Sequence, residues 1–221
     1  MNKNAIIRIK KIISSKCGRD YINALNASFK DCETLLDVGC GKNSPIQYAK
    51  NKPKYSVGID AFEPSLKESM QKKIHNKYRL MDVMDLGDKF DKNSFDCVLA
   101  NDLIEHLNKD DSEKLIKMME GVARKKVVIF TPNGFVEQDK YDDNTWQEHL
   151  CGWSYREMLE RGYEVSGMAG LKYLKGYKAK VRFKPRILWR IISELSQFLT
   201  KKLLPKYSFA IFCVKNIRNK D

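Results

Sequence analysis

Several features that would place this chain of 221 residues in a common class are missing from it. No uninterrupted apolar run approaches the roughly 20 residues that a membrane-spanning helix requires, which argues against a helical membrane protein. Its six cysteines are scattered and form no C-x-x-C pair, so neither a thioredoxin-type site nor a zinc site is indicated. The sequence also has no internal repeats and no low-complexity segment, which argues against a solenoid or a disordered chain.

A signal peptide is not recognisable either, so we expect reduced cysteines and a cytoplasmic protein, with a peripheral position at a membrane as an alternative. The composition, with 43% hydrophobic residues, is sufficient for a sizeable core. The length fits one domain with an appendage. We expect an N-terminal helical segment at 1–30 and one domain at 31–221, with a basic helical insertion at about 171–206.

The net charge of +13 is distributed unevenly along the chain. Residues 1–30 carry a net charge of +6 and residues 170–221 carry +12, whereas residues 31–169 carry −5. Basic ends favour an anionic partner, which can be a nucleic acid, a membrane surface or a phosphorylated substrate. The alternative is an ordinary solvated surface.

Short buried strands alternate with amphipathic helices through the centre of the chain, which predicts an α/β domain with a parallel sheet and helices on both faces. Apolar residues at helical spacing predict a helical N-terminal region over 5–14 and 18–28. The expected strands are 33–39, 55–60, 77–82, 95–101, 126–131, 163–170 and 208–216. The expected helices of the domain are 45–51, 64–73, 111–124, 154–161 and 186–203.

The stretch LLDVGCGKNSP, residues 35–45, predicts a strand that runs into a tight turn over a ligand. Asp60 ends the next strand, 19 residues after Gly41, where a carboxylate can accept hydrogen bonds from both hydroxyls of an adenosine ribose. That arrangement fits NAD and S-adenosylmethionine equally. The glycine pattern favours NAD less, because Ser44 occupies the third glycine position of G-x-G-x-x-G.

Five motifs in the same order resemble those of class I S-adenosylmethionine-dependent methyltransferases, in particular the small-molecule enzymes of the ubiquinone-pathway O-methyltransferase group. They are DVGCG, GID, MDVMDL, FDCVLANDLIEHL and KVVIFTPNG, within about 33–170. The resemblance implies a Rossmann-like, seven-stranded, mostly parallel sheet with helices on both faces and an antiparallel last strand. Asn43 replaces the third glycine of the family's first motif, which requires that Asn43 adopt a left-handed backbone.

The resemblance also implies where S-adenosylmethionine binds. Asp37 would meet the ammonium group, Asp60 the ribose, and Asp82 with the Val83 N–H the adenine, although Asp82 can instead cap a helix. Met81 and Leu103 can flank the adenine or simply pack in the core. The complete set of expected cofactor-binding residues is Asp37, Gly39, Cys40, Gly41, Asp60, Ala61, Asp82, Val83, Asn101 and Leu103.

The exit of the fourth expected strand, NDLIEH, is not the N/D-P-P-Y/F motif of enzymes that methylate the amino groups of DNA bases. This difference argues against methylation of DNA bases. Glu105, His106 and His149 fall near the expected substrate mouth and are the candidate catalytic residues, with a histidine as general base for a hydroxyl acceptor. His75 is expected at the surface, and Trp153 either lines the substrate pocket or packs against the last helix.

A second interpretation of the same residues is a metal site. If the segment is helical, Asp102, Glu105 and His106 lie on one face. With His149, they resemble the divalent-metal site of small-RNA 2′-O-methyltransferases and ubiquinone-pathway O-methyltransferases, which would hold Mg²⁺ or Mn²⁺. The third interpretation is that Glu105 and His106 only brace the cofactor loop.

The insertion at about 171–206 has two parts. Its first part interleaves Tyr173, Tyr177 and Phe183 with seven lysines and arginines, a pattern that suits contact with RNA. Its second part is a helix with an apolar stripe (Leu188, Ile191, Ile192, Leu195 and Leu199). This helix can lie on an anionic membrane, or it can cover the active site or the sheet edge as an ordinary packed helix.

These observations lead to one expected activity and two alternatives. We expect an S-adenosylmethionine-dependent methyltransferase that acts on an oxygen of a small molecule or of a glycan or lipid-linked precursor. The alternatives are an RNA ribose 2′-O-methyltransferase and a non-catalytic S-adenosylmethionine-binding protein. Against the RNA enzyme, the chain has no separate RNA-binding module.

Overall fold

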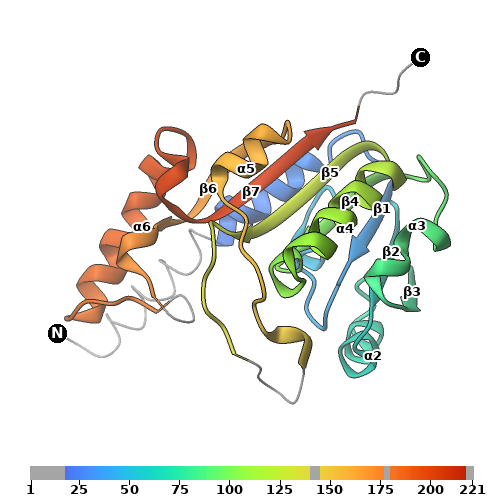
Figure 1. Ribbon diagram of the computed structural model, residues 1–221, viewed down its shortest axis with the longest axis horizontal. Coiled ribbons are helices and arrows are strands. Elements are labelled where there is room, and N and C mark those ends of the chain that lie inside the picture. The colour runs from blue at the N-terminus through green and yellow to red at the C-terminus, as the bar shows by residue number, and fades with distance from the viewer. Residues whose placement is uncertain (1–17, 140–144, 177–179, 218–221) are drawn as a thin grey trace.

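The computed structural model describes residues 18–139, 145–176 and 180–217 and contains one seven-stranded sheet (Figure 1). The strand order is β3-β2-β1-β4-β5-β7-β6. The first five strands pair in parallel and the last strand, β7, is antiparallel, as the sequence predicts. In addition, β7 lies between β5 and β6. The strands are β1 (Thr34–Val38), β2 (Tyr55–Asp60), β3 (Lys77–Leu80), β4 (Phe95–Asn101), β5 (Ala123–Pro132), β6 (Glu164–Leu171) and β7 (Ser208–Asn216).

Helices lie on both faces of the sheet. In addition to a helix over residues 18–28, they are α2 (Glu63–Gln71), α3 (Leu86–Lys89), α4 (Lys109–Val122), α5 (Tyr155–Glu160) and α6 (Arg186–Lys202). The 3-10 turns are η1 (Pro45–Tyr48), η2 (Val83–Asp85), η3 (Ile104–His106), η4 (Thr145–Gln147), η5 (Lys172–Leu174) and η7 (Pro205–Tyr207). The predicted segment 5–14 lies outside the described residues.

The central strands are apolar on both sides because each side has its own core. In β1, Leu36 and Val38 belong to the core that also contains Leu115 and Ile116 of α4. Leu35, which directly precedes Leu36, belongs to the opposite core, together with Leu25 and Phe29 from the N-terminal helical region. Two covered faces explain why these strands read as continuous apolar runs rather than as alternating ones.

Local capping sets the start of two predicted helices. At α4, the Asn108 side chain accepts a hydrogen bond from the Asp111 N–H at 2.9 Å. At α5, Ser154 and Glu157 form a reciprocal capping box. The predicted helix over 45–51 is shorter, because only the turn η1 forms after Ser44.

The orientation of α6 is opposite to that of an ordinary packed helix. Its buried residues are Ser193, Ser196, Gln197 and Thr200. Of the predicted apolar stripe, Leu188, Leu195 and Leu199 are exposed, whereas Ile191 and Ile192 are half-buried. The sequence left open whether this helix covers the sheet edge or lies on a membrane. The helix packs against the edge strand β6 through its small polar side. Among the described residues, none of the helices combines the length and the hydrophobicity needed to cross a membrane.

Candidate functional site

The carboxyl ends of β1 to β4 meet at one edge of the sheet and bring the predicted motifs together. In the register of the sheet, Val38 pairs with Ile59 and with Ala100, while Asp60 pairs with Leu80. The turn after β1, Asp60, and the residues that follow β3 and β4 consequently face one another. This edge is where ligands bind in parallel α/β sheets.

The turn after β1 depends on two glycines. Gly39 and Gly41 have φ angles of +65° and +56°, in the left-handed region that disfavours residues with a side chain. A Cβ atom at Gly39 would also lie only 2.5 Å from the side chain of Leu103. Asn43 is not among the residues with positive φ, so the expectation of a left-handed Asn43 is wrong. Its exposed amide oxygen instead accepts a hydrogen bond from Lys72.

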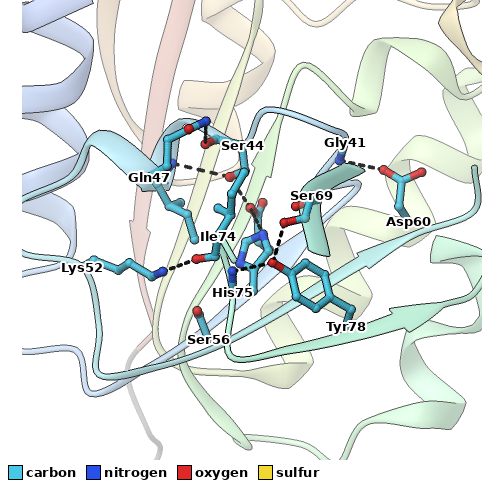
Figure 2. Close-up of polar contacts among 12 residues, drawn as sticks. Gly41, Ser44, Gln47, Lys52, Ser56, Asp60, Ser69, Ile74, His75 and Tyr78 are labelled. Carbon is cyan, nitrogen blue, oxygen red and sulfur yellow. Dashed lines mark hydrogen bonds and ion pairs between the residues drawn. The ribbon is translucent and has the colours of Figure 1, made fainter. Parts of the chain in front are cut away.

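Asp60 holds the glycine turn in place (Figure 2). Its Oδ2 atom accepts a hydrogen bond from the Gly41 N–H at 2.7 Å, and its Oδ1 atom accepts one from the Phe62 N–H at 2.8 Å. Burial raises the pKa of Asp60 above its ordinary value. Each oxygen retains a second lone pair for a further donor.

From the sequence, Asp82 could either contact the adenine or cap a helix, and in the structure it caps a turn. Its Oδ1 atom accepts a hydrogen bond from the Met84 N–H at 2.9 Å and caps the turn η2. Asp82 also lines the cavity at the sheet edge, as do Val83 and Leu103, while Met81 packs against the core. Capping and ligand binding are thus compatible for this carboxylate.

A single cavity at this edge brings together all ten residues that were expected to bind the cofactor: Asp37, Gly39, Cys40, Gly41, Asp60, Ala61, Asp82, Val83, Asn101 and Leu103. Its further lining residues are Asn43, Ser44, Pro45, Phe62, Ser65, Asp102, His106, Leu107, Trp146 and Gln147. The cavity therefore joins the glycine turn to one of the expected catalytic histidines.

Asp37 lies at the buried base of the cavity. Its Oδ2 atom accepts a hydrogen bond from the Ser44 hydroxyl at 2.5 Å and lies 3.4 Å from Nε2 of His75. Burial raises the pKa of Asp37 to about 7, although the Ser44 hydrogen bond opposes this shift. A cationic group of a ligand would stabilise the charged form of this carboxylate.

His75 is buried, so its predicted surface position is wrong. Its backbone N–H donates to the Tyr78 hydroxyl at 2.8 Å, and this hydroxyl donates to the Ser69 carbonyl at 2.8 Å (Figure 2). The ammonium group of Lys52 donates to the carbonyl of Ile74, the preceding residue. Burial lowers the pKa of His75 to about 3, so the ring is neutral.

Glu105, His106 and His149, which we call the Glu105 cluster, come together at the end of β4. One potential donor atom from each side chain lies within 4.8 Å of the others. The backbone explains how a distant residue arrives there: the Glu105 carbonyl accepts hydrogen bonds from the N–H groups of Leu150 and Cys151 at 2.8 and 3.2 Å. These bonds fasten the segment that carries His149 to η3.

The Glu105 cluster has the donors that a divalent metal requires. The Oε2 atom of Glu105 accepts a hydrogen bond from Thr131, while Oε1 is buried and has no hydrogen-bond partner among the described residues. His106 Nδ1 lies 3.0 Å from the Glu148 carbonyl, and His149 Nδ1 lies 2.6 Å from the Val136 carbonyl. A carbonyl accepts hydrogen, so the neutral His149 ring carries its proton on Nδ1 and has its lone pair on Nε2. The His106 ring lies beside two backbone carbonyls, those of Glu148 and Asp102.

The electrostatics of the Glu105 cluster follow from its burial. Burial raises the pKa of Glu105 and lowers that of His149. It also lowers the pKa of His106 to about 4. A neutral imidazole of such low basicity accepts a proton less readily than an ordinary histidine, but it retains the lone pair that a metal needs.

Asp102 does not join this arrangement. It precedes η3 with a left-handed φ of +47°, and its carboxylate accepts a hydrogen bond from the Asn101 amide at 3.0 Å. The predicted common helical face is therefore wrong, since η3 begins only at Ile104. Within the described part of the chain, the potential metal ligands are the three residues of the Glu105 cluster.

The sequence did not indicate two aromatic residues at or near the cavity, Trp146 and Tyr21. It left open the position of a third, Trp153. Trp153 is buried away from the cavity, where its Nε1 donates to Ser112 at 2.7 Å, so it packs against α4. Trp146 lines the cavity instead. Tyr21, from the N-terminal helix, donates a hydrogen bond to the Asn101 side chain. No residue spacing in the sequence indicates either Trp146 or Tyr21.

Comparison with known proteins agrees with this geometry. Residues 36–131 match the family model described as a methyltransferase domain. No curated protein matches the chain. Among solved structures, an S-adenosylmethionine-dependent methyltransferase from Archaeoglobus fulgidus superposes with a TM-score of 0.58 at 19% identity, and the match covers 94% of each chain.

Two further structures share the fold. The magnesium protoporphyrin IX methyltransferase from Synechocystis, solved with bound S-adenosylmethionine, has a TM-score of 0.52 at 14% identity, over 97% of this chain and 86% of that one. The complex between the Haloferax volcanii Trm112 methyltransferase activator and a methyltransferase gives 0.58 at 13% identity, over 99% and 96%. The chain therefore contains a methyltransferase domain over residues 36–131 and has the fold of solved S-adenosylmethionine-dependent methyltransferases.

Proposed function

We propose that this methyltransferase transfers the methyl group of S-adenosylmethionine to an oxygen atom of a small molecule or of a glycan or lipid-linked precursor. The observation that carries the proposal is that His106 of the Glu105 cluster lines the same cavity as the glycine turn and Asp60. A hydroxyl acceptor must lose a proton during transfer, which makes groups that handle protons or bind metals useful beside the donor.

The ten predicted cofactor residues supply a complementary surface for S-adenosylmethionine within this proposal. The buried Asp37 carboxylate pairs with the ammonium group, and Asp60 accepts from the ribose hydroxyls through its remaining lone pairs. The free oxygen of Asp82 accepts from the adenine amino group. The backbone of Gly39 and Gly41 allows the methionine portion to lie close to the turn.

For the Glu105 cluster we propose a divalent metal rather than a free histidine base. The low pKa of His106 is poorly matched to proton removal near neutral pH. Two imidazoles and one carboxylate suit a transition metal such as Mn²⁺ or Fe²⁺ better than Mg²⁺, because Mg²⁺ prefers oxygen ligands. When bound, such a metal lowers the pKa of a coordinated hydroxyl group.

Ribose methylation of RNA is the alternative function. A ribose 2′-hydroxyl is also an oxygen acceptor, and the net charge of +12 in residues 170–221 favours an anionic substrate. The two candidates differ in their salt dependence. Binding of an RNA oligonucleotide should weaken steeply with salt, whereas binding of an uncharged small acceptor should not.

The first experiment is calorimetric titration of the full chain with S-adenosylhomocysteine, with NAD as the control nucleotide. Binding of the homocysteine compound alone is expected. Preferential binding of NAD would overturn the cofactor assignment. Label transfer from methyl-labelled S-adenosylmethionine to hydroxyl acceptors, to their amino analogues and to RNA then tests the acceptor. Transfer to the amines alone would overturn O-methylation.

A separate experiment tests the metal. Co²⁺ is titrated into the protein after chelation, and its visible absorption reports tetrahedral or five-coordinate binding. Glu105→Gln should abolish this absorption but leave the affinity for S-adenosylhomocysteine within about twofold, since the carboxylate lies outside the cofactor portion of the cavity. The exposed Glu160→Gln on α5 is the control and should retain the absorption. An unchanged spectrum in Glu105→Gln would remove the metal from the proposal.

A further inference from the structure

The outer side of α6 exposes a row of large apolar side chains. Leu195 and Phe198 are 62% and 81% exposed, and Leu203, immediately after the helix, is 69% exposed. Leu188 and Leu199 are exposed as well. We call these five residues the outer face of α6. Soluble proteins rarely expose so many large apolar side chains in one row unless that row binds something.

The side of α6 that faces β6 has no room for the large side chains of the outer face, because the helix lies extremely close to this strand. A Cβ atom at Gly167 would lie 2.1 Å from the Thr200 carbonyl oxygen, and one at Gly170 would lie 2.1 Å from the Ser193 carbonyl oxygen. Only glycine on the strand and small side chains on the helix permit this approach. A leucine turned inward would have no space.

Hydrogen bonds fix the rotation of α6 about its axis. The side-chain oxygen of Gln197 accepts from the Gly170 N–H at 2.8 Å, and its amide nitrogen donates to the Gly167 carbonyl at 3.1 Å. Ser196 Oγ accepts from the Leu171 N–H at 2.9 Å. Rotating the helix to bury its leucines would break all three buried hydrogen bonds. The fold therefore fixes the outward orientation of these leucines.

Basic side chains flank the outer face at both ends. Lys184 and Arg186 are exposed at the start of α6, and Lys202 and Lys206 are exposed at its end. Glu194 is the one acidic residue in the helix. An apolar strip between basic ends matches the interface of an anionic bilayer, where acyl chains accept the leucines and headgroup phosphates attract the lysines and arginines.

Charge argues against the other occupants of this face. A second copy would bring another region of net charge +12 against the first, and residues 1–30 of the same chain carry +6. RNA offers complementary charge, but its bases stack on aromatic rings, and four of the five residues of the outer face are leucines. Figure 1 shows α6 beside β6 at one end of the molecule.

We propose that the outer face of α6 docks this methyltransferase on the surface of an anionic phospholipid bilayer. The helix lies in the plane of the interface, with Leu195 and Phe198 inserted and the flanking basic residues at the headgroups. This docking is independent of which acceptor the enzyme methylates. It would confine the cavity to the neighbourhood of the membrane.

The test is co-sedimentation of the full chain with vesicles of phosphatidylcholine alone and of phosphatidylcholine mixed with phosphatidylglycerol. We expect binding to the anionic vesicles alone, and weaker binding as NaCl rises from about 50 to about 500 mM. The double variant Leu195→Gln with Phe198→Gln should lower the vesicle affinity by roughly tenfold or more. The exposed Met70→Gln on α2 is the matched control and should bind like the wild type.

Two readouts separate docking from misfolding and from the proposed enzymatic function. The melting temperature and the affinity for S-adenosylhomocysteine should be unchanged in the double variant, because both side chains are exposed. Failure of vesicle binding in a protein that still binds S-adenosylhomocysteine would overturn the membrane proposal alone. Equal vesicle binding by the double variant and the wild type would overturn it too.

Three further outcomes would assign the face to another occupant and overturn the proposal. One is a doubled mass in light scattering that the double variant abolishes, with no vesicle binding, which indicates a second copy. Another is RNA binding that is lost in the double variant while vesicles are ignored. The third is vesicle binding that appears only after deletion of residues 1–17, which would mean that the chain's own N-terminal segment covers the face.

Discussion

The Oδ2 atom of Asp37 lies 3.4 Å from Nε2 of His75, and both side chains are fully removed from solvent. The two groups do not form a charged pair, because burial raises the pKa of Asp37 to about 7 and lowers that of His75 to about 3. Near neutral pH the imidazole is uncharged and the carboxyl group is close to its midpoint. Of these two groups, Asp37 is therefore the one that changes charge in the physiological range.

We first predict that cofactor affinity depends on pH through Asp37. If this carboxylate meets the ammonium group, affinity for S-adenosylhomocysteine should rise between about pH 6 and pH 8, with a limiting slope of about tenfold per pH unit. Asp37→Asn should bind more weakly and lose this dependence. Calorimetry at several pH values measures both.

The matched control ligand for this prediction is 5′-methylthioadenosine, which has the adenosine and the sulfur but not the amino acid portion. Its affinity should vary little over the same pH range. If both ligands showed the same slope, the titrating group would not be the one that faces the ammonium, and Asp37 would lose this role.

The second prediction concerns stability without cofactor. The folded pKa of Asp37 is raised to about 7 from 3.8. The folded protein thus binds this proton more tightly than the unfolded chain. The resulting stabilisation is complete below the unfolded pKa and is lost as the pH rises through the folded pKa. Asp37→Asn stays neutral, so it should raise the free energy of unfolding at pH 8 by about 1–3 kcal/mol.

Urea denaturation of the wild type and of Asp37→Asn, at about pH 5 and pH 8, measures this difference. The gain should be clearly smaller at the lower pH, where the wild-type carboxyl group is already protonated in the folded state. An equal gain at both pH values would point to packing rather than ionisation. The variant should thus be more stable but a poorer cofactor binder, as expected where function requires a buried charge.

The third prediction is a pair of glycine substitutions with opposite signs. A Cβ atom at Gly58 would lie 2.4 Å from the His75 ring, whereas one at Gly121, near the end of α4, meets nothing within 4 Å. Gly58→Ala should lower the free energy of unfolding by about 1–3 kcal/mol through overpacking. Gly121→Ala should raise it by about 0.5–1 kcal/mol, because alanine favours the helix.

Thermal and urea denaturation of the two variants at one pH checks the pair. The double variant Gly58→Ala with His75→Ala should recover part of the loss, since removal of the ring makes room for the methyl group. A neutral effect of Gly58→Ala would show that the ring can move away, and the packing of His75 against β2 would then not constrain the cavity.

The parallel core of the fold was predictable because its signals are local. Leu35, Leu36 and Val38 are apolar on both sides of β1, and two glycines follow at the turn, so both the strand and the ligand edge can be read from a few neighbouring residues. The order of the motifs then indicated the family. Local periodicity and glycine punctuation are sufficient where burial on both faces is obligatory.

The side of α6 that packs was not predictable in the same way. Periodicity identifies which side of a helix is apolar, but the neighbouring strand decides which side is buried. In this protein Gly167 and Gly170 select the side with Ser193 and Thr200. His75 illustrates the same limit, because its burial in the loop before β3 depends on the missing side chain of Gly58 in β2. Such choices depend on contacts between segments distant in the sequence.

The last prediction concerns Asp60, whose two oxygens already accept hydrogen bonds from the backbone of Gly41 and Phe62. Asp60→Ala removes these bonds together with the proposed bonds to the ribose hydroxyls. It should weaken S-adenosylhomocysteine binding by more than about tenfold, because each lost hydrogen bond to a charged acceptor contributes about 1.5–3 kcal/mol. Unchanged affinity would exclude Asp60 from the cofactor site.

Asp60→Asn separates the two roles of this carboxylate. The amide keeps one oxygen that can accept from the Gly41 N–H, so the turn should be retained, but its NH₂ group cannot accept from a ribose hydroxyl or from the Phe62 N–H. We expect an intermediate loss of affinity for S-adenosylhomocysteine, measured by calorimetry. The same variant should lose less affinity for S-adenosylhomocysteine in which the ribose hydroxyls have been removed, because that ligand has no ribose bond to lose. Equal losses for the two ligands would mean that Asp60 acts only by holding the glycine turn.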